Sequence, residues 1–272
     1  MLFAVFPALA VHGLPWPLVV LIGVGLGLGS GLFGIGGSSI ATPVLRLLGL
    51  PALIALASPL PLTLPGAIGG ALAYQQKGLI CWPVVVWTGI WGVPGVLLGA
   101  WLTEFLPAQG LMLLTALFVL GVGVYGLTGL KGRQSLEDCP QIQMGVIPYG
   151  AMLTGLLSGL LANGGGLLLV PFYRLGVGLG LRSALATSLA TVGLLALPGT
   201  LVHYYLGHVD WLLTGWLAAG VLPSTYLGSQ LALRLPLNFL SRLYSLFLIV
   251  LACYFGVTQL QVIGTIASLF KP

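Results

Sequence analysis

Two glycine-rich breaks have the residue types and spacing that suit binding of a small anion. The first is Gly34-Ile-Gly-Gly-Ser-Ser39, and the second is Ala162-Asn-Gly-Gly-Gly166. Each stands between a full-length apolar segment and a short one, and glycine allows the backbone to turn there. A helix that starts after such a break has unpaired N–H groups and a partial positive charge at its N-terminus. Two of these ends facing each other would attract an anion, whereas close helix packing is the alternative role of the glycines.

Small polar side chains accompany both breaks and extend the candidate site. Ser58 and Thr187 occupy matched positions in two similar stretches of sequence. Their hydroxyls suit an anion, or alternatively a hydrogen bond back to a carbonyl of their own helix. The candidate anion-binding residues are Gly36, Gly37, Ser38, Ser39, Ser58, Asn163, Gly164, Gly165, Gly166, Thr187 and Ser188. For the glycines that precede the first break we favour close helix packing, and these are Gly23, Gly25, Gly27 and Gly31.

Charged and metal-binding side chains are scarce, which narrows the possible chemistry. Glu104 and Asp210 lie at predicted segment ends, and no acid falls in the middle of an apolar segment. This argues against a carboxylate relay for protons or sodium. The Lys and Arg residues are predicted to lie in loops, so backbone N–H groups and hydroxyls would hold the anion. Catalytic motifs and metal-ligand spacings are missing, so we expect a non-enzyme without metal or cofactor.

The composition requires a membrane environment. Hydrophobic residues make up 58% of the chain and charged residues 5%, whereas roughly a quarter of the residues are charged in soluble proteins. This excludes a soluble enzyme, a nucleic-acid binder and a disordered protein. Apolar runs without alternation predict an all-α integral membrane protein, surrounded by lipid, with about 8–10 transmembrane segments. The runs cover 16–34, 37–49, 52–74, 80–103, 107–130, 145–162, 166–178, 182–205, 209–232 and 236–258.

The chain is internally duplicated. A polar linker at 131–143 separates a first half, 1–130, from a second half, 144–272. Shifted by 128 positions, residues 27–47 match residues 155–175 with ten identities. After one inserted residue the match continues at a shift of 129 and pairs tryptophan, proline and tyrosine positions. Such self-similarity predicts two structural copies of one unit.

The distribution of Lys and Arg favours an inverted arrangement of the two copies. If each half crosses the membrane four times, the cations divide four against five. If the short segments 37–49 and 166–178 each add a crossing, seven cations share one side, a strong cytoplasmic signal. These seven are Lys77, Lys131, Arg133, Arg174, Arg182, Arg234 and Arg242, against Arg46 and Lys271. An odd crossing count inverts the second half and places the N-terminus outside and the linker in the cytoplasm. Half-helices that meet in mid-membrane remain the alternative for the short segments.

The quoted repeats resemble a known family. The stretches GLGSGLFGIGGSSIATPVL and ASPLPLTLPGAIGGALAY, repeated as GLLSGLLANGGGLLLVPF and ALATSLATVGLLALPGTLVHYYLGHVDW, are similar to the TauE/SafE sulfite exporters. The resemblance implies transport of a small sulfur-containing anion, such as sulfite, thiosulfate or an organosulfonate, in the cell inner membrane. The chain departs from the pattern at Pro59 and Pro61, where the second half has Ser188 and Ala190. The alternative function is a membrane assembly or scaffold protein, and the oligomeric state stays open.

Overall fold

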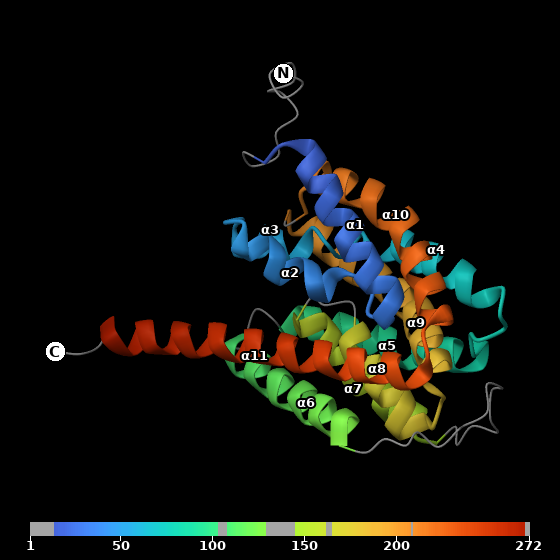
Figure 1. The fold of residues 1–272 in the computed structure, drawn as a ribbon. Helices are drawn as coiled ribbons and strands as arrows, with labels where there is room; N and C mark the ends of the chain where they lie inside the picture. The colour runs from blue at the N-terminus through green and yellow to red at the C-terminus, as the bar shows by residue number, and fades with distance from the viewer. Residues whose placement is uncertain (1–13, 103–107, 129–144, 162–164, 208, 270–272) are drawn as a thin grey trace.

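A computed structural model describes residues 14–102, 108–128, 145–161, 165–207 and 209–269 as helices joined by short connections (Figure 1). The first half contributes α1 (Trp16–Phe33), α2 (Ser38–Leu47), α3 (Ala52–Ala57), α4 (Thr63–Gln75), α5 (Trp82–Leu102) and α6 (Ala108–Thr128). The second half contributes α7 (Ile147–Leu161), α8 (Gly166–Phe172), the π-helical turn η3 (Tyr173–Val177), α9 (Leu181–Tyr205), α10 (Trp211–Arg234) and α11 (Leu237–Leu269). The elements of the two halves follow in a similar order, except that α3 and α4 stand where the second half has the single helix α9, and that η3 extends α8.

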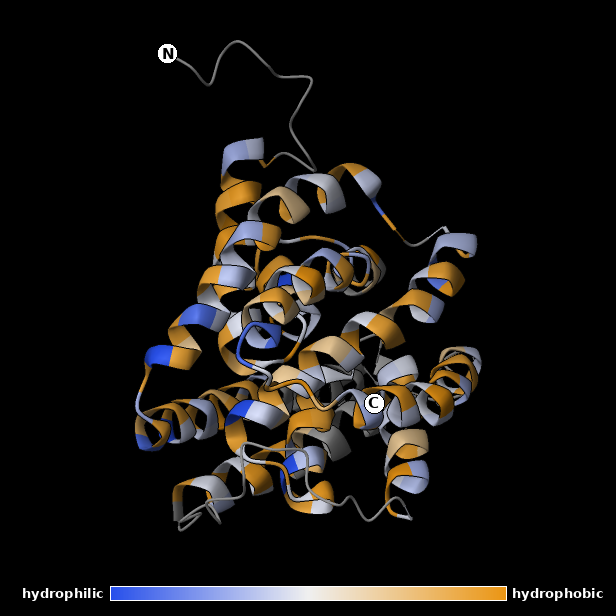
Figure 2. Ribbon diagram, turned by 90° about the vertical axis from the view of Figure 1, so that its right-hand side faces the viewer, coloured by the Kyte–Doolittle hydropathy of each residue, from blue (hydrophilic) through white to orange (hydrophobic). Residues whose placement is uncertain are grey.

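The prediction of an all-α membrane protein is confirmed. Four helical stretches of the described residues are long and apolar enough to cross a membrane: α1, α5, α9 and the Leu237–Tyr254 part of α11. Hydrophobic residues predominate along the ribbon in Figure 2. The predicted segment 52–74 is divided into α3 and α4 at residues 58–62, where Pro59 and Pro61 cannot donate helical hydrogen bonds. Helix α11 extends to Leu269, beyond the predicted end of the last run at 258.

The two halves interlock through equivalent helix pairs. We call positions related by the shift of 128 or 129 equivalent, so that α1 corresponds to α7 and α5 to α10. The most extensive packing is between α1 and α10, and the next is between α7 and α5, which is the equivalent pair with the halves exchanged. Helices α6 and α11, which are equivalent to each other, lie side by side in Figure 1 and pack together. Each half therefore completes its core with helices of the other half, and their relative inversion stays a prediction.

Glycines at these interfaces bring helix backbones together. A Cβ atom on Gly23, Gly27 or Gly31 of α1 would overlap backbone atoms of α10. Equivalent glycines of α7, Gly155 and Gly159, approach the α5 backbone in the same way. The predicted packing role is therefore confirmed for these positions of α1. For Gly25 the prediction is wrong, because a Cβ there would have no atom within 4 Å.

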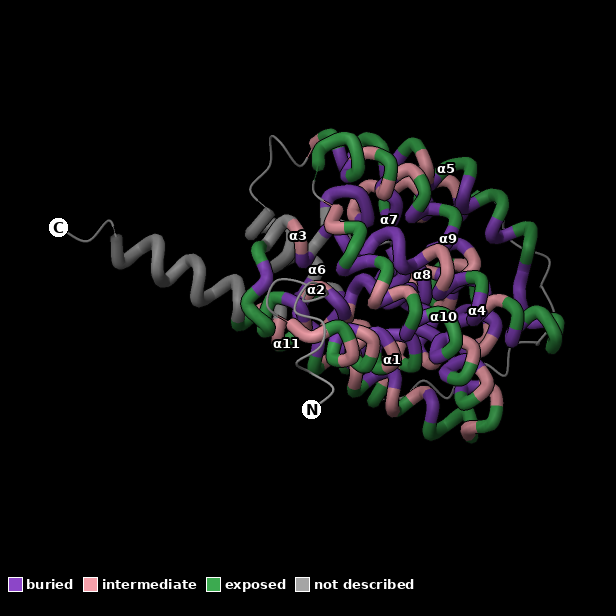
Figure 3. Tube along the Cα trace, turned by 90° about the horizontal axis from the view of Figure 1, so that it is seen from above, coloured by how far each residue is buried: buried purple, intermediate pink, exposed green. Residues whose placement is uncertain are grey.

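The outer surface of the helices is apolar, as contact with lipid requires. Exposed residues follow the outward faces of the helices in Figure 3, and buried residues follow the faces between them. Large side chains such as Leu21, Ile68 and Val250 are at least 60% exposed. In water these surfaces would be an aggregation hazard, whereas hydrocarbon solvates them. The polar groups inside are mainly hydroxyls, and they gather around the glycine breaks and helix starts described below.

Candidate functional site

The first break is a tight turn between α1 and α2. Gly34 ends α1 with a φ of 67°, and its N–H donates to the Ser30 carbonyl at 2.8 Å. Gly36 and Gly37 follow with φ values of 76° and 74°. This left-handed region is costly for residues with a Cβ, so the glycine run is what allows the chain to reverse here. Helix α2 then begins at Ser38, and the whole turn is buried.

The second break lies directly against the first. Gly165, with a φ of 78°, precedes α8, and Gly166 is the first residue of that helix. A Cβ on Gly166 would overlap the backbone of Ile35, which is the middle of the first break. Of the predicted site residues in this break, Asn163 and Gly164 lie outside the described residues. The structure thus packs the start of α8 against the turn that precedes α2, and anion binding at this contact stays a prediction.

Neither short helix is long enough to cross a membrane alone. Helix α2 has 10 residues, and α8 with η3 continues from Gly166 to Val177. At about 1.5 Å per residue, these helices reach roughly 15–18 Å, about half of the hydrocarbon core. They have the dimensions of half-helices, which is the alternative that the sequence left open. The count of five crossings per half therefore stays a prediction.

Helix α9 forms a wall of the first break. The Ser188 hydroxyl donates to the Gly34 carbonyl at 2.8 Å. A Cβ on Gly34 would overlap the Leu185 backbone, and one on Gly36 would overlap the Val192 side chain. Among the candidate hydroxyls, Ser188 is therefore the one that the structure places in contact with a break from a distant segment. Ser38 and Ser39 are also fully buried at the start of α2.

Ser58 and Thr187 make equivalent hydrogen bonds at the starts of two long helices. The Ser58 hydroxyl accepts from the backbone N–H of Asp210, which precedes α10, at 3.0 Å. The Thr187 hydroxyl accepts from the backbone N–H of Cys81, which precedes α5, at 3.1 Å. Asp210 and Cys81 are themselves equivalent positions. These bonds join the two halves. The sequence predicted either anion binding or a bond within the same helix for these hydroxyls, so this role is new. An accepting hydroxyl can still donate its hydrogen, so both residues stay candidates for the site.

Sequence reasoning missed Ser30, a buried hydroxyl beside the first break. Ser30 is 0% exposed, and its Oγ has no hydrogen-bond partner among the described residues. It lies 3.8 Å from the position of a Cβ on Gly37. In the second half, the Oγ atom of the equivalent residue Ser158 lies 3.2 Å from the position of a Cβ on Gly165. The signal was available, because both serines belong to the matched stretches Gly27-Leu-Gly-Ser-Gly-Leu32 and Gly155-Leu-Leu-Ser-Gly-Leu160.

The expectation that every cation lies in a loop is wrong for five arginines that belong to helices, namely Arg46, Arg174, Arg182, Arg234 and Arg242. Arg174 belongs to η3 and lines a recess together with Tyr244 of α11. The recess is separate from the breaks and is described below.

Comparison with known proteins identifies the family. The sequence pattern of the sulfite exporter TauE/SafE family matches residues 19–255. The chain belongs to this family. The match to TauE/SafE proteins includes α1, both breaks, α9 and most of the described part of α11, so the arrangement described above lies within the family region.

Similar proteins carry transporter names. A "Probable membrane transporter protein" of Xylella fastidiosa strain 9a5c is 31% identical over 248 residues, which is 87% of this chain and 94% of that protein. The "Probable membrane transporter protein YdhB" of Bacillus subtilis is 26% identical over 226 residues, covering 80% of this chain and 91% of that protein. No solved structure matches the chain. The chain is thus a member of a membrane transporter family and a multi-pass membrane protein.

Proposed function

We propose that the protein carries a small sulfur-containing anion, such as sulfite, thiosulfate or an organosulfonate, across the cytoplasmic membrane. The family supports transport, and its name supports the class of anion. The observation that carries the proposal is the contact between the two breaks, in which Gly166 abuts Ile35. Two equivalent helix starts, buried and surrounded by hydroxyls, are the kind of arrangement that anion transporters place near the middle of the bilayer.

The anion would bind through backbone N–H groups and hydroxyls. The Ser38 N–H donates to the Gly36 carbonyl at 2.9 Å, so the N–H groups that would bind the anion are those of Ser39 in α2 and Gly166 in α8. Each helix start would add partial positive charge. Ser30 would donate its hydroxyl hydrogen, which costs the fold nothing because Oγ has no other partner. A hydrogen bond to a charged group contributes about 1.5–3 kcal/mol. Several such bonds give binding that compensates the desolvation of the anion yet allows release.

Transport would require the two breaks to separate and close again. In the structure they are packed backbone against backbone, so an anion would enter when the two breaks move apart. The equivalent pairs α1–α10 and α7–α5 are natural units for such a movement, because each joins helices of both halves. An inverted repeat would then expose the site alternately to the two sides of the membrane. In this arrangement the linker 131–143 faces the cytoplasm and the N-terminus faces outward.

Transport and the role of Ser30 can be tested on the purified protein. Vesicles containing the protein should take up or release labelled sulfite or thiosulfate, and protein-free vesicles should not. Ser30→Ala should weaken anion binding about tenfold in calorimetry, because a bond to a charged group is lost, while the thermal stability is unchanged. Ser224→Ala is the matched control, since this hydroxyl bonds the Gly220 carbonyl of its own helix at 2.6 Å.

Two outcomes would contradict the proposal. Vesicles without flux of any tested anion would favour the assembly or scaffold function. Flux together with full anion affinity in Ser30→Ala would place the binding site elsewhere in the transporter.

A further inference from the structure

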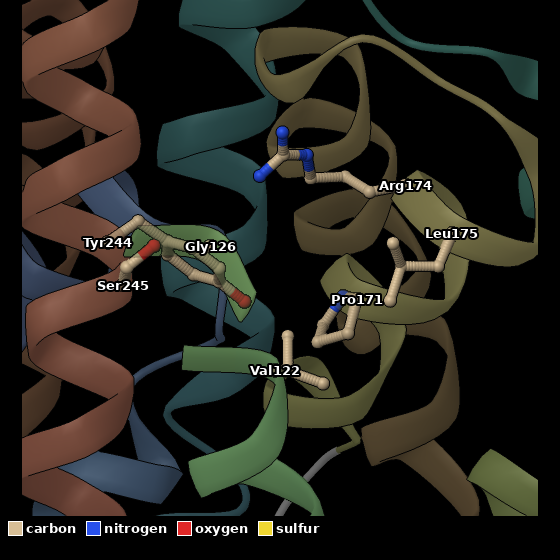
Figure 4. A pocket seen from close by; sticks show the side chains of 7 residues that line it. All are labelled: Val122, Gly126, Pro171, Arg174, Leu175, Tyr244 and Ser245. Carbon is tan, nitrogen blue, oxygen red and sulfur yellow. The ribbon is translucent and has the colours of Figure 1, made fainter. Parts of the chain in front are cut away.

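A recess between α6, η3 and α11 is the most distinctive polar feature outside the breaks. Its enclosed space is about 10 Å³, roughly the room of a single water molecule, and the figure rises to about 270 Å³ only when the space open to the outside is included. Its apolar walls are formed by Val122 of α6, Pro171 of α8 and Leu175 of η3. Polar groups enter from Arg174 on η3 and from Tyr244 and Ser245 on α11 (Figure 4). The recess therefore combines a cation and hydroxyls with walls that exclude water from part of its surface.

Tyr244 presents a buried hydroxyl without a partner. The residue is 2% exposed, and its hydroxyl oxygen has no hydrogen-bond partner among the described residues. The ring is held in place by Phe33, with the ring centroids 6.1 Å apart. In Figure 4 the Arg174 side chain extends from η3 toward α11, and its guanidinium is drawn above the Tyr244 hydroxyl, which is directed toward Val122. Buried hydroxyls nearly always have partners, so this one indicates a place for a hydrogen-bond acceptor.

Arg174 lacks an acidic counterpart in the recess. The described residues that line the recess include no Asp or Glu. Among the described residues the acidic side chain is that of Asp210, which lies elsewhere. Its carboxylate accepts hydrogen bonds from the N–H groups of Leu212 and Leu213 at the start of α10. A guanidinium that is partly withdrawn from water without a counter-charge is unfavourable, and an anion would compensate it. Its planar fork of donors matches two oxygens of an oxyanion.

Ser245 and Gly126 complete the recess. Ser245 is 1% exposed, and its hydroxyl donates to the Ser241 carbonyl of the same helix at 2.9 Å. Serine commonly makes this hydrogen bond in a helix when no other acceptor is near. Rotation about the Cα–Cβ bond would turn the hydroxyl toward a ligand. Gly126 of α6 faces this hydroxyl, and a Cβ there would overlap Ser245 Oγ. A glycine is thus what keeps the Ser245 side chain accessible from the recess.

The first half of the chain does not repeat this arrangement. Arg46, the equivalent of Arg174, is exposed and donates to the Leu50 carbonyl at 3.4 Å. The positions equivalent to Tyr244 and Ser245 are Thr115 and Ala116. The two copies therefore keep the arginine but differ in its surroundings and in the residues at the two hydroxyl positions. Packing alone would not require this difference, whereas a site that serves one side of the membrane would.

We propose that Arg174, Tyr244 and Ser245 form a binding site for an oxyanion with at least two free oxygens, separate from the glycine breaks. The guanidinium binds two oxygens, and the tyrosine and serine hydroxyls donate to the remaining one or to the same pair. The ligand chemistry is that of a sulfate, sulfite or phosphate group. Such a group arrives either as a free anion or as the phosphate of an anionic lipid headgroup. Arg174 lies eight residues after Gly166, about 12 Å along the short helix, so this site is distinct from the contact between the breaks.

The test uses the full chain purified in detergent, with sodium sulfate as the probe. Tyr244→Phe removes one hydroxyl that has no partner in the fold, so the variant should fold and bind sulfate at the recess about tenfold more weakly. Arg174→Gln should abolish binding at the recess. Arg46→Gln is the control for the loss of an arginine, and Tyr149→Phe, at an 81% exposed position, is the control for the loss of a tyrosine hydroxyl. Ser30→Ala should leave this binding unchanged, which separates it from the breaks.

Native mass spectrometry of the same samples distinguishes the two sources of the ligand. Calorimetric sulfate binding that depends on Arg174 and Tyr244 supports a free anion. Retained phosphatidylglycerol that is lost in both variants but kept in Arg46→Gln supports a lipid phosphate. If both recess variants bind sulfate and retain lipid as the two controls do, or if the unaltered protein binds neither ligand, the site does not exist.

Discussion

The contact between the breaks predicts that Gly166→Ala will impair transport more than it impairs folding. A Cβ at this position would lie 2.5 Å from the carbonyl carbon and from Cα of Ile35. Carbon atoms in contact normally stand about 3.5–4.0 Å apart, so the two breaks would have to separate by about 1 Å. Insertion of a methyl group into such a packed contact costs about 1–3 kcal/mol. Alanine is a better helix former than glycine by up to about 1 kcal/mol, which offsets part of that cost.

The net penalty of Gly166→Ala falls on the conformation in which the breaks touch. A penalty of about 1.4 kcal/mol lowers the population of that conformation tenfold relative to those in which the breaks are apart. If each transport cycle passes through the closed contact, the flux falls by about the same factor. The assay is the initial rate of labelled sulfite flux in vesicles, normalised to the amount of folded protein. Thermal unfolding of the same samples measures the effect on stability.

Gly25→Ala is the matched control for this substitution. Gly25 lies within α1 and faces open space, so a methyl group there meets no atom within 4 Å. Helix propensity alone should make this variant slightly more stable, by about 0.5–1 kcal/mol, with unchanged flux. The reasoning fails if folded Gly166→Ala transports at the unaltered rate. It also fails if Gly25→Ala slows transport equally, since the effect would then not come from the break.

Two further predictions follow from the equivalent hydrogen bonds and from the charge distribution. Ser58→Ala and Thr187→Ala should each lower the free energy of unfolding by about 1 kcal/mol, because each leaves the N–H before a long helix without its acceptor; a much larger loss in one of them would contradict the equivalence of the two bonds. If the linker side is cytoplasmic, a Gln76→Cys variant without other cysteines should react with an impermeant thiol reagent only after the cells are opened. An Arg46→Cys variant of the same background should react in intact cells. The reverse pattern would show that the topology is inverted.

The sequence was sufficient for the fold class, because the apolar runs and the duplication are properties of the chain alone. Nearly all predicted segments correspond to helices, and the glycine runs at Gly36 and Gly165 separate one helix from the next, as predicted. The division of 52–74 was not foreseen, although its cause, Pro59 and Pro61, was visible. Hydropathy measures whether a run can enter a membrane, and it is insensitive to a turn inside that run.

The candidate site was predicted less completely, because contacts between distant segments decide what a hydroxyl does. Ser58 and Thr187 look like ligands or helix-internal donors in the sequence, yet each accepts from the other half of the molecule. Gly25 has the same spacing as its neighbours in α1, but it points away from α10. Ser30 was overlooked because a serine among glycines resembles packing, and its missing partner becomes apparent only in three dimensions.

The departures from the internal duplication are more informative about function than the duplication itself. Equivalent residues that keep equivalent contacts, such as Ser58 and Thr187, are explained by the stability of two copies of one unit. Ser38 and Gly166 are equivalent but differ, and Gly166 is the position at which the two breaks touch. Arg46 and Arg174 share a residue type but differ in surroundings, since the second faces Tyr244 across a recess. A transporter must act differently toward the two sides of a membrane, whereas two identical inverted copies would present the same groups to both sides. The residues at which the halves diverge are therefore the places where direction and selectivity can be built into the fold.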